Sequence, residues 1–275
     1  MYKVLRKTAL TPTVVRMDVE APLMAKKAKP GQFIILRPHA DSERIPLTIA
    51  SYDPEEGSVS VIFQVVGETT RELNQIPAGG YIQDFVGPLG NATEVEGLKR
   101  VLIVGGGVGC AIALPIAQEL HRLGAEVHSV IGFRTKDLVI LEEDFAQCSD
   151  KLVVMTDDGS YGTKGLVTTT IEELVAQGNQ YDEVIAIGPM MMMKFVCQTT
   201  QKLGLKTVVS MNAVMVDGTG MCGGCRVTVG GQTKFACVDG PDFDGHQVDW
   251  DEIIKRVSMY KEFEANCNLM NQEVK

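Results

Sequence analysis

Apolar runs alternate with segments of helical spacing between residues 100 and 210, and this alternation constrains the fold more strongly than any other feature. Three of the apolar runs read RVLIVGGGVG, EVHSVIGF and DKLVVMTDDG. Between such runs, apolar side chains recur at helical spacing over about ten to fifteen residues. Strands that alternate with helices of this length form a parallel sheet covered by helices. We therefore expect an α/β domain over residues 99–210.

Residues 1–98 follow a different pattern. Short segments rich in Val, Ile and Thr, such as GQFIILRP, IPLTIASYD and GSVSVIFQVVG, are separated by Pro-Gly, Asp-Pro and Glu-Gly turns. Short strands with frequent turns are typical of an antiparallel barrel or sandwich. The sequence therefore predicts a β-barrel domain over residues 1–98, with a change of fold class near residue 98.

The composition limits the classes of partner that the chain can bind. A length of 275 residues allows two domains and a small module, and 45% hydrophobic and 22% charged residues are typical of a globular protein. Because the net charge is −9 and the Lys and Arg residues form no cluster, the sequence argues against nucleic-acid and anionic-membrane partners. It has no apolar run of eighteen residues and no signal-peptide pattern, so we expect a cytoplasmic protein.

The segment VLIVGGGVGC joins the first expected strand of the α/β domain to its first helix. Glycines at such a turn allow a phosphate to approach backbone N–H groups at the positive end of the helix. The candidate contacts are Gly105, Gly106, Gly107 and Gly109. The dehydrogenase fingerprint would also need Gly or Ala in place of Cys110, and an acidic residue where Arg134 follows the next strand. A plain Rossmann dehydrogenase is therefore disfavoured, and a turn without a ligand stays open.

Three of the seven cysteines lie close together in the glycine-rich segment 216–240, as Cys222, Cys225 and Cys237. The others are scattered singly through the chain, as Cys110, Cys148, Cys197 and Cys267. This pattern favours free thiols plus a metal site over disulfides. Glycines let the backbone turn toward thiolate sulfurs, as an iron–sulfur cluster requires. Zinc is the alternative metal, although zinc sites usually bring histidines and only His246 lies nearby.

A barrel followed by an α/β domain with a glycine turn resembles the ferredoxin-NADP reductase superfamily, in which the barrel binds FAD and the second domain binds the nicotinamide nucleotide. The strand ERIPLTIAS is similar to the superfamily's R-x-Y-S strand, with Thr48 in the place of the Ser and Leu47 in the place of the aromatic residue. Arg44 lies one residue further upstream than in that pattern, and FQVVGETTREL offers contacts to phosphate. The resemblance implies FAD contacts from Arg44, Pro46, Leu47, Thr48, Val65, Gly67, Thr69 and Thr70.

The same resemblance implies contacts with the nicotinamide nucleotide beyond the glycine turn. The loop TDDGSYGTKG follows an expected strand, and its Asp157 and Asp158 are candidates to face a ribose. The segment IGPMMMMKF is similar to the superfamily's G-P-x-x-M motif and contributes Gly188, Pro189 and Met190. Both segments also have an explanation that needs no ligand, as a helix cap and as a helix start with core methionines.

Opposing charges bear on the choice of nucleotide. Arg134 would suit the 2′-phosphate of NADP(H), whereas the acidic pair at 157–158 would repel it. We therefore expect NAD(H), with NADP(H) as the alternative.

The cysteine spacing resembles that of the electron-transfer subunit of bacterial dihydroorotate dehydrogenase, which holds a [2Fe–2S] cluster with C-x4-C-x2-C and a later fourth cysteine. This chain reads D-x4-C-x2-C-x11-C, with Asp217 in the place of the first cysteine. Ligation by three cysteines and one aspartate is a property of the small subunit of NADH-dependent ferredoxin:NADP oxidoreductase, the electron-bifurcating transhydrogenase also called sulfide dehydrogenase. This resemblance covers about residues 1–240 and implies the cluster ligands Asp217, Cys222, Cys225 and Cys237. A plain turn role for Asp217 stays open.

The resemblance implies an electron-transfer flavoprotein subunit without a catalytic side chain of its own. It would move hydride between NAD(P)H and FAD, and single electrons through the [2Fe–2S] cluster to a large subunit with a second FAD and [4Fe–4S] clusters, in a heterodimer or larger complex. Two alternatives stay open: the electron-transfer subunit of dihydroorotate dehydrogenase, and a non-enzymatic nucleotide- or redox-sensing module.

The last part of the chain is expected to hold the cluster module and a helix. Residues 211–240 would form the module and residues 241–275 a helical tail. The tail has apolar residues at roughly helical spacing, namely Ile253, Ile254, Val257, Tyr260 and Phe263. This face would contact either a partner subunit or the chain's own domain.

Overall fold

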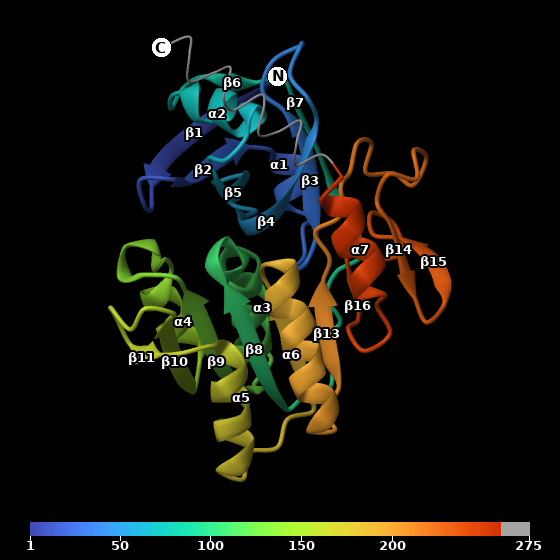
Figure 1. Ribbon diagram of the computed structural model, residues 1–275. Coiled ribbons are helices and arrows are strands. Elements are labelled where there is room, and N and C mark those ends of the chain that lie inside the picture. Colours follow the sequence, from blue (N-terminus) through green and yellow to red (C-terminus); the bar gives the residue numbers. More distant parts are fainter. Residues whose placement is uncertain (260–275) are drawn as a thin grey trace.

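The chain places a curled antiparallel sheet against one end of a mixed α/β sheet, with a small hairpin module to one side of both (Figure 1). The computed structural model describes residues 1–259. Within that range, no helix is long and apolar enough to cross a membrane. The predicted Tyr260, Phe263 and Cys267 lie outside the described residues.

The N-terminal part forms a seven-stranded antiparallel sheet with the order β6-β1-β2-β5-β4-β3-β7. Its strands are β1 (Tyr2–Ala9), β2 (Val14–Glu20), β3 (Phe33–Arg37), β4 (Ile45–Asp53), β5 (Ser58–Gln64), β6 (Tyr81–Ile82) and β7 (Asp84–Leu89). Its helices are α1 (Pro22–Ala25) and α2 (Glu68–Gln75). Only Gln83 separates the two end strands, so the sheet curls around a core that includes Met17, Leu36, Phe63 and Phe85.

Asp18 is a buried charge on β2 that the neighbouring strands neutralise. Its carboxylate accepts hydrogen bonds from Arg6 Nε at 2.7 Å, Arg16 Nε at 3.0 Å and Ser60 Oγ at 2.6 Å. Burial by itself would raise the pKa of Asp18, but the bonds from Ser60, Arg6 and Arg16 outweigh it and lower the pKa. The carboxylate therefore stays ionised and ties β1, β2 and β5 together.

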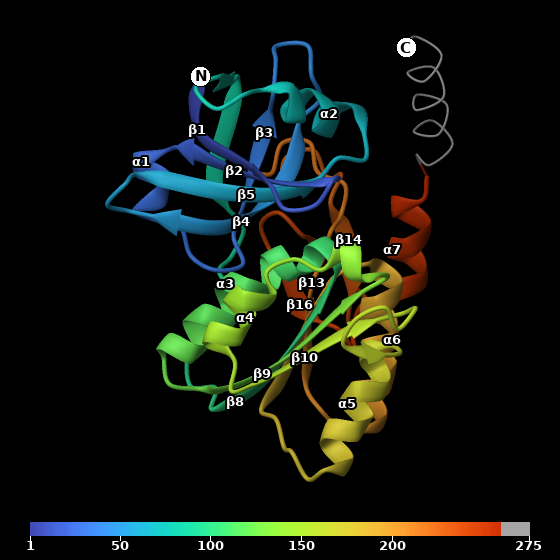
Figure 2. The ribbon, with the colours of Figure 1, turned by 90° about the vertical axis from the view of Figure 1, so that its left-hand side faces the viewer.

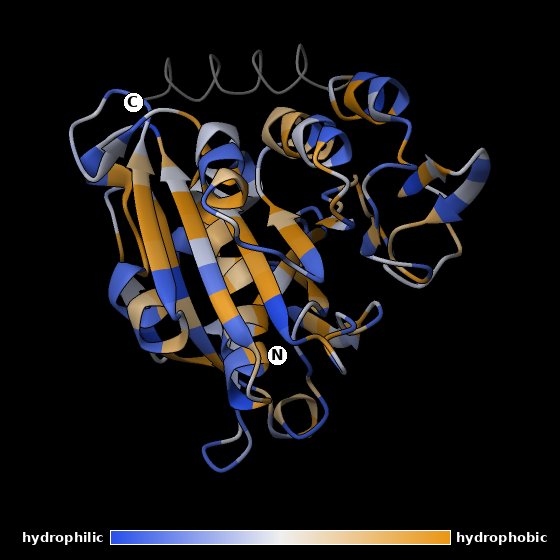
Figure 3. Cartoon of the chain, turned by 90° about the horizontal axis from the view of Figure 1, so that it is seen from below, coloured by the Kyte–Doolittle hydropathy of each residue, from blue (hydrophilic) through white to orange (hydrophobic). Residues whose placement is uncertain are grey.

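The second sheet has the order β11-β10-β9-β8-β12-β13-β16, and its strands are parallel except for the β13–β16 pair. The strands are β8 (Arg100–Gly106), β9 (Glu126–Phe133), β10 (Lys151–Thr156), β11 (Thr163–Lys164), β12 (Glu183–Ile187), β13 (Thr207–Ser210) and β16 (Asp242–Asp244). The helices are α3 (Cys110–Arg122), α4 (Glu142–Cys148), α5 (Val167–Ala176) and α6 (Met190–Lys202). Viewed from below, apolar strands lie between helices on both faces, with α3 and α4 packed on one face and α5 and α6 on the other (Figure 3).

The strand order of this sheet reverses at β8. From β8 the chain runs outward to β9 and β10, and it then returns to form β12 on the other side of β8. Ligands of open α/β sheets bind at the carboxyl ends of the strands at such a reversal. The glycine turn after β8 and the Gly188–Pro189 turn after β12 both lie at this end of the sheet.

Strand β16 is not predicted from the sequence, because residues 241–275 are expected to form a helical tail, whereas helix α7 begins only at Trp250. Only three residues long, β16 buries Phe243 between two aspartates, so it carries too little periodicity to be recognised. It pairs antiparallel with β13 and returns the chain to the edge of the α/β sheet.

The hairpin module consists of β14 (Arg226–Val229) and β15 (Gln232–Phe235). Gly230 and Gly231 form its turn with φ angles of +58° and +73°, a conformation that strongly favours glycine. Helix α7 (Trp250–Val257) packs against β14 and lies beside α6 (Figure 2). On α7, Ile253 is buried and Ile254 packs against the same core, so this part of the predicted apolar face contacts the chain's own domain.

Candidate functional site

One large cleft lies between the antiparallel sheet and the carboxyl ends of the parallel strands. Its volume is about 1960 Å³. Pockets for a single drug-sized ligand usually have volumes of about 300 to 1000 Å³. The cleft therefore has room for two extended ligands end to end, one against each sheet.

Most of the predicted FAD and nucleotide contacts line this cleft, although they come from distant parts of the sequence. They are Arg44, Pro46, Leu47, Thr48, Gly67, Thr69, Thr70, Gly106, Gly107, Gly109, Arg134, Asp157, Gly188 and Pro189. The predicted contacts from the barrel and from the α/β domain thus meet in one space.

Four predicted contacts do not line the cleft. Val65 packs against the barrel core, and Met190 packs against the core of the α/β sheet. Gly105 is buried beneath Cys110, whose Sγ would lie 2.8 Å from a Cβ at position 105. The Asp158 carboxylate accepts hydrogen bonds from Ser160 N at 2.9 Å and Ser160 Oγ at 2.7 Å. Packing or local hydrogen bonding therefore accounts for each of these residues.

On the barrel side, β4 and the N-terminus of α2 present polar groups to the cleft. Residues 45–48 of β4 are half-buried along the cleft wall. The hydroxyl of Thr70 accepts hydrogen bonds from the N–H groups of Val66 and Gly67, both at 3.0 Å, and closes the first turn of α2. A helix N-terminus of this kind attracts phosphate groups. The predicted phosphate role of residues 67–70 thus rests on backbone N–H groups more than on hydroxyls.

Arg44 is the cation at the other end of this wall. Its Nη2 lies 3.7 Å from Asp84 Oδ2, whereas Arg37 Nη2 lies 2.8 Å from the same atom. Arg37 therefore already neutralises Asp84. The half-exposed Arg44 side chain can turn toward an anion in the cleft at little cost.

On the α/β side, the glycines after β8 serve two different purposes. A Cβ at Gly109 would lie 2.5 Å from the carbonyl oxygen of Ile187, and one at Gly106 would lie 2.3 Å from Met192 Sδ. These two glycines allow the turn after β8 to pack directly against the turn after β12. Gly107 has a φ of +54°, and a Cβ there would meet no atom within 4 Å. Its backbone therefore faces open space at the start of the α3 region.

Arg134 and Asp157 lie exposed at the ends of β9 and β10, and both line the cleft. Lys136, a further cation nearby, places its Nζ 5.5 Å from the centre of the Tyr161 ring, and its backbone N–H donates to Ser160 Oγ at 2.8 Å. Hydrogen bonds from Ser160 lower the pKa of Asp158. At this end of the cleft, Arg134 is thus the cation and Asp157 the carboxylate that line the space.

Residues 211–216 form a wall of the cleft that the sequence analysis does not predict. Met211, Ala213 and Met215 are buried in the same core as Cys225 and Cys237. The alternate residues Asn212, Val214 and Val216 are exposed, and the whole segment lines the cleft. One extended backbone therefore separates the cleft from the cysteines. Five of the six residues in MNAVMV are apolar, so the sequence has no polar–apolar alternation that would have revealed this wall.

The four predicted cluster ligands lie in and after the loop that follows this wall. Cys225 and Cys237 are buried with their sulfurs 3.2 Å apart, and Cys237 N donates to Cys225 Sγ at 3.4 Å. Burial, together with the neighbouring Cys225, raises the pKa of Cys237 to about 12. Cys222 is exposed, and its Sγ accepts a hydrogen bond from Gly224 N at 3.4 Å.

Asp217 is held by backbone donors of the same loop. Its Oδ1 accepts from Thr219 N and its Oδ2 from Cys222 N, both at 2.7 Å. These bonds from Thr219 and Cys222 lower the pKa of the carboxyl, so it is ionised. A carboxylate oxygen has two lone pairs and can accept an N–H while it ligates a metal. The geometry is thus compatible with both the turn role and the ligand role.

The donor set of this loop suits an iron–sulfur cluster better than a zinc ion. Three thiols and an ionised carboxylate come from one glycine-rich segment, in which Gly218, Gly220 and Gly223 have positive φ. Through residue 259, no three His, Cys, Asp or Glu side chains are grouped closely enough to hold one metal ion, and among the three predicted cysteine ligands the structure brings only the sulfurs of Cys225 and Cys237 into contact. His246, the candidate zinc ligand, is instead hydrogen-bonded to Thr200 Oγ1 at 3.1 Å.

The cysteine loop packs directly on the barrel. A Cβ at Gly218 would lie 2.8 Å from side-chain atoms of both Ile35 on β3 and Leu89 on β7. Phe33 on β3 lines the cleft and belongs to the same core as Cys225 and Cys237. The loop is therefore held against the barrel wall that also borders the cleft.

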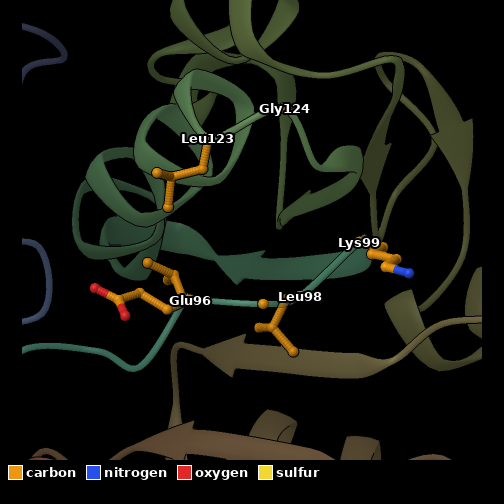
Figure 4. Close-up of a pocket in the computed structure, with 7 residues that line it drawn as sticks. Glu96, Leu98, Lys99, Leu123 and Gly124 are labelled. Atoms are coloured by element: carbon orange, nitrogen blue, oxygen red, sulfur yellow. The ribbon is translucent and has the colours of Figure 1, made fainter.

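A smaller cavity of about 300 Å³ lies at the opposite end of β8, around residues 95–99, Leu123 and Gly124 (Figure 4). Figure 4 shows the charged ends of Glu96 and Lys99 pointing away from each other. None of the predicted site residues lines this cavity. The candidate site is therefore the large cleft and the adjoining cysteine loop.

Comparison with known proteins agrees with this geometry. Residues 212–249 match the family of the iron–sulfur cluster binding domain of dihydroorotate dehydrogenase B. The chain is 48% identical to the dihydroorotate dehydrogenase B (NAD(+)) electron transfer subunit homolog of Thermotoga maritima, across 96% of this chain and 93% of that protein. It is 34% identical to the dihydroorotate dehydrogenase B (NAD(+)) electron transfer subunit of Streptococcus pneumoniae strain R6, across 88% of this chain and 94% of that protein.

A solved structure of NADH-dependent reduced ferredoxin-NADP oxidoreductase contains a chain of the same fold. It is 45% identical and superimposes with a TM-score of 0.93, covering 100% of this chain and 98% of that one. The predicted resemblance and the predicted ferredoxin-reductase-like fold with an iron–sulfur-binding domain are thus confirmed. The chain belongs to the family of dihydroorotate dehydrogenase B electron-transfer subunits and their homologues, and is an electron-transfer subunit of an oxidoreductase.

Proposed function

We propose that the chain transfers hydride between NAD(H) and a bound FAD and passes single electrons through a [2Fe–2S] cluster to a partner subunit. The observation that carries the proposal is the wall formed by residues 211–216, which borders the cleft on one side and the core of Cys225 and Cys237 on the other. When bound, FAD supplies conversion between two-electron and one-electron transfer, and the cluster supplies one-electron transfer. The protein's own task is to hold these groups close together and in a fixed orientation.

The barrel wall would hold the flavin. Residues Pro46, Leu47 and Thr48 of β4 offer a half-buried surface for a planar ring, and the N-terminal N–H groups of α2 would bind phosphate together with Arg44. Phe33 is buried behind this surface and excludes water from the side of the cysteine loop.

The ends of the parallel strands would hold the nucleotide. Gly107 leaves room for a phosphate near the start of α3, and Gly188 and Pro189 border the same space from β12. Asp157 would accept hydrogen bonds from ribose hydroxyls and repel a 2′-phosphate, which favours NAD(H). Arg134 supports NADP(H) as the second candidate.

Asp217, Cys222, Cys225 and Cys237 would ligate the cluster. Their thiols must lose protons on binding iron, because thiolate is the ligating form. The raised pKa of Cys237 means that this thiol keeps its proton at neutral pH while no metal is bound, so formation of the site would release that proton.

The partner would dock over the cysteine loop. Two apolar residues in and beside this loop are exposed, Met221 by 87% and Val238 by 44%. Exposed apolar groups of this kind are typical of protein interfaces. We propose as occupant a large oxidoreductase subunit with its own flavin and [4Fe–4S] clusters. A dihydroorotate dehydrogenase catalytic subunit is the second candidate, favoured by the names of several relatives.

Anaerobically purified protein tests the proposal. We expect one FAD per chain after denaturation, two irons and two acid-labile sulfides per chain, and flavin bleaching that is faster with NADH than with NADPH. Protein without flavin and sulfide would refute the electron-transfer role, and cofactor-bound protein that NADH and NADPH leave oxidised would favour a sensing module. Mass spectrometry of the complex isolated from its host would identify the partner.

A further inference from the structure

Two arginines contact the short turn between Cys222 and Cys225. Arg226 Nη1 donates to the carbonyl oxygen of Gly223 at 3.4 Å, and Arg256 Nη2 donates to the carbonyl oxygen of Gly224 at 3.2 Å. The carbonyls of both glycines between the two cysteines therefore face a guanidinium group.

The direction of these carbonyls fixes the direction of the neighbouring N–H groups. In a planar trans peptide, the C=O of one residue and the N–H of the next point in opposite directions. Because Arg226 holds the carbonyl of Gly223 outward, the N–H of Gly224 points to the other side, where it meets Cys222 Sγ at 3.4 Å. By the same geometry, the contact from Arg256 turns the N–H of Cys225 away from helix α7.

Arg256 reaches this turn from a firmly anchored helix. Asp249 caps α7 by accepting from Glu252 N at 3.0 Å, and the Trp250 indole donates to the carbonyl of Gly245 at 3.0 Å. Lys194 on α6 pairs with Asp251 at 2.6 Å. Arg256 itself is half-buried, whereas Arg226 is exposed. The planar guanidinium of Arg256 is therefore held in place, while that of Arg226 is freer to move.

We propose that Arg256 is a positioning residue that sets the reduction potential of the cluster, an inference that rests on the cluster proposed above. It holds the carbonyl of Gly224, and with it the peptide that leads to Cys225, in the turn in which Gly224 N donates to Cys222 Sγ at 3.4 Å, and it adds a positive charge beside the cysteines. Reduction adds negative charge to the cluster, and hydrogen bonds to the sulfurs are among the factors that tune its potential. Both effects of Arg256 therefore stabilise the reduced form and raise the potential.

The test compares three variants of the full chain, each carrying its cofactors. Arg256→Gln removes the positive charge and the planar guanidinium donors, whereas Arg256→Lys keeps the charge but not the planar donors. Lys255→Gln removes one charge from the exposed neighbouring position of the same helix. The measurements are iron and sulfide content, and the midpoint potential from a redox titration followed by electron paramagnetic resonance.

We expect a lower midpoint potential in Arg256→Gln, a smaller downward shift in Arg256→Lys, and the wild-type potential in Lys255→Gln. Loss of iron from Arg256→Gln together with retention in Arg256→Lys would also support the positioning role. Equal potentials in the wild type and both Arg256 variants would overturn it, as would equal shifts in Arg256→Gln and Lys255→Gln. A wild-type chain that binds no iron would instead refute the proposed cluster.

Discussion

Replacing Gly109 with alanine should disrupt the close packing between the turns after β8 and β12. The added Cβ would lie 2.5 Å from the carbonyl oxygen of Ile187 and 2.7 Å from Cα of Gly188. The first distance is about 0.9 Å shorter than the 3.4 Å at which ordinary contact begins. Both obstacles are backbone atoms of a buried strand and its turn, so they cannot turn aside as a flexible side chain would.

The expected loss of stability follows from this overlap. Overpacked cores cost about 1 to 3 kcal/mol, and a clash with backbone belongs in the upper part of that range. We therefore expect the free energy of unfolding to fall by about 2 to 3 kcal/mol. The displaced turn should also lose about one backbone hydrogen bond to the nucleotide phosphate, which would weaken NADH binding about tenfold.

Gly178→Ala is the matched control. Gly178 has a φ of +89°, a Cβ there would meet no atom within 4 Å, and the residue lies beyond the end of α5, away from the cleft. This variant should lose about 1 kcal/mol from backbone strain alone and keep its NADH affinity. Urea unfolding followed by circular dichroism gives the stability, and calorimetric titration with NADH gives the Kd. If Gly109→Ala matches Gly178→Ala in both measurements, the packing argument is wrong.

Three further predictions concern the aspartates. Because the pKa of Asp18 is lowered on folding, its contribution to stability is present above about pH 4 and is lost as the pH falls through the lowered value. Asp18→Asn should therefore reduce the free energy of unfolding by about 2 kcal/mol at pH 7 and by less at pH 3, and equal losses in urea unfolding at both pH values would contradict this. Asp217→Ala should lose the cluster and Asp217→Cys should keep one with an altered absorption spectrum, whereas an unchanged spectrum in the alanine variant would exclude Asp217 as a ligand. Asp157→Asn should lower the preference for NADH over NADPH about tenfold in stopped-flow flavin reduction, and an unchanged ratio would remove Asp157 from nucleotide selection.

The order of the two main sheets could be predicted because their signals are local. The alternation of apolar runs with helical segments after residue 100 reports burial on both faces of each strand, and this follows from the sequence alone. The spacing of Cys222, Cys225 and Cys237 is likewise a local property, and the hairpin of β14 and β15 brings the sulfurs of Cys225 and Cys237 to 3.2 Å from each other. Such features need no knowledge of how the domains pack.

Two of the predicted contacts have short-range explanations that need no ligand. Gly105 belongs to the same glycine run as Gly107, yet it is buried against Cys110 while Gly107 faces the cleft. Asp158 is adjacent to Asp157 in the sequence, yet the Asp158 carboxylate accepts a hydrogen bond from Ser160 Oγ. A sequence pattern identifies the loop, but it does not tell which of two adjacent side chains faces the ligand.

The sequence by itself determined the fold class, because strand periodicity is a property of neighbouring residues, and it offers Asp217, Cys222, Cys225 and Cys237 as predicted cluster ligands. Only the tertiary structure decided that residues 211–216 separate the cleft from the cysteines, and that Arg256 reaches the turn between Cys222 and Cys225. These contacts join segments that come together only when the barrel, the α/β sheet and α7 are packed, so no local pattern contains them.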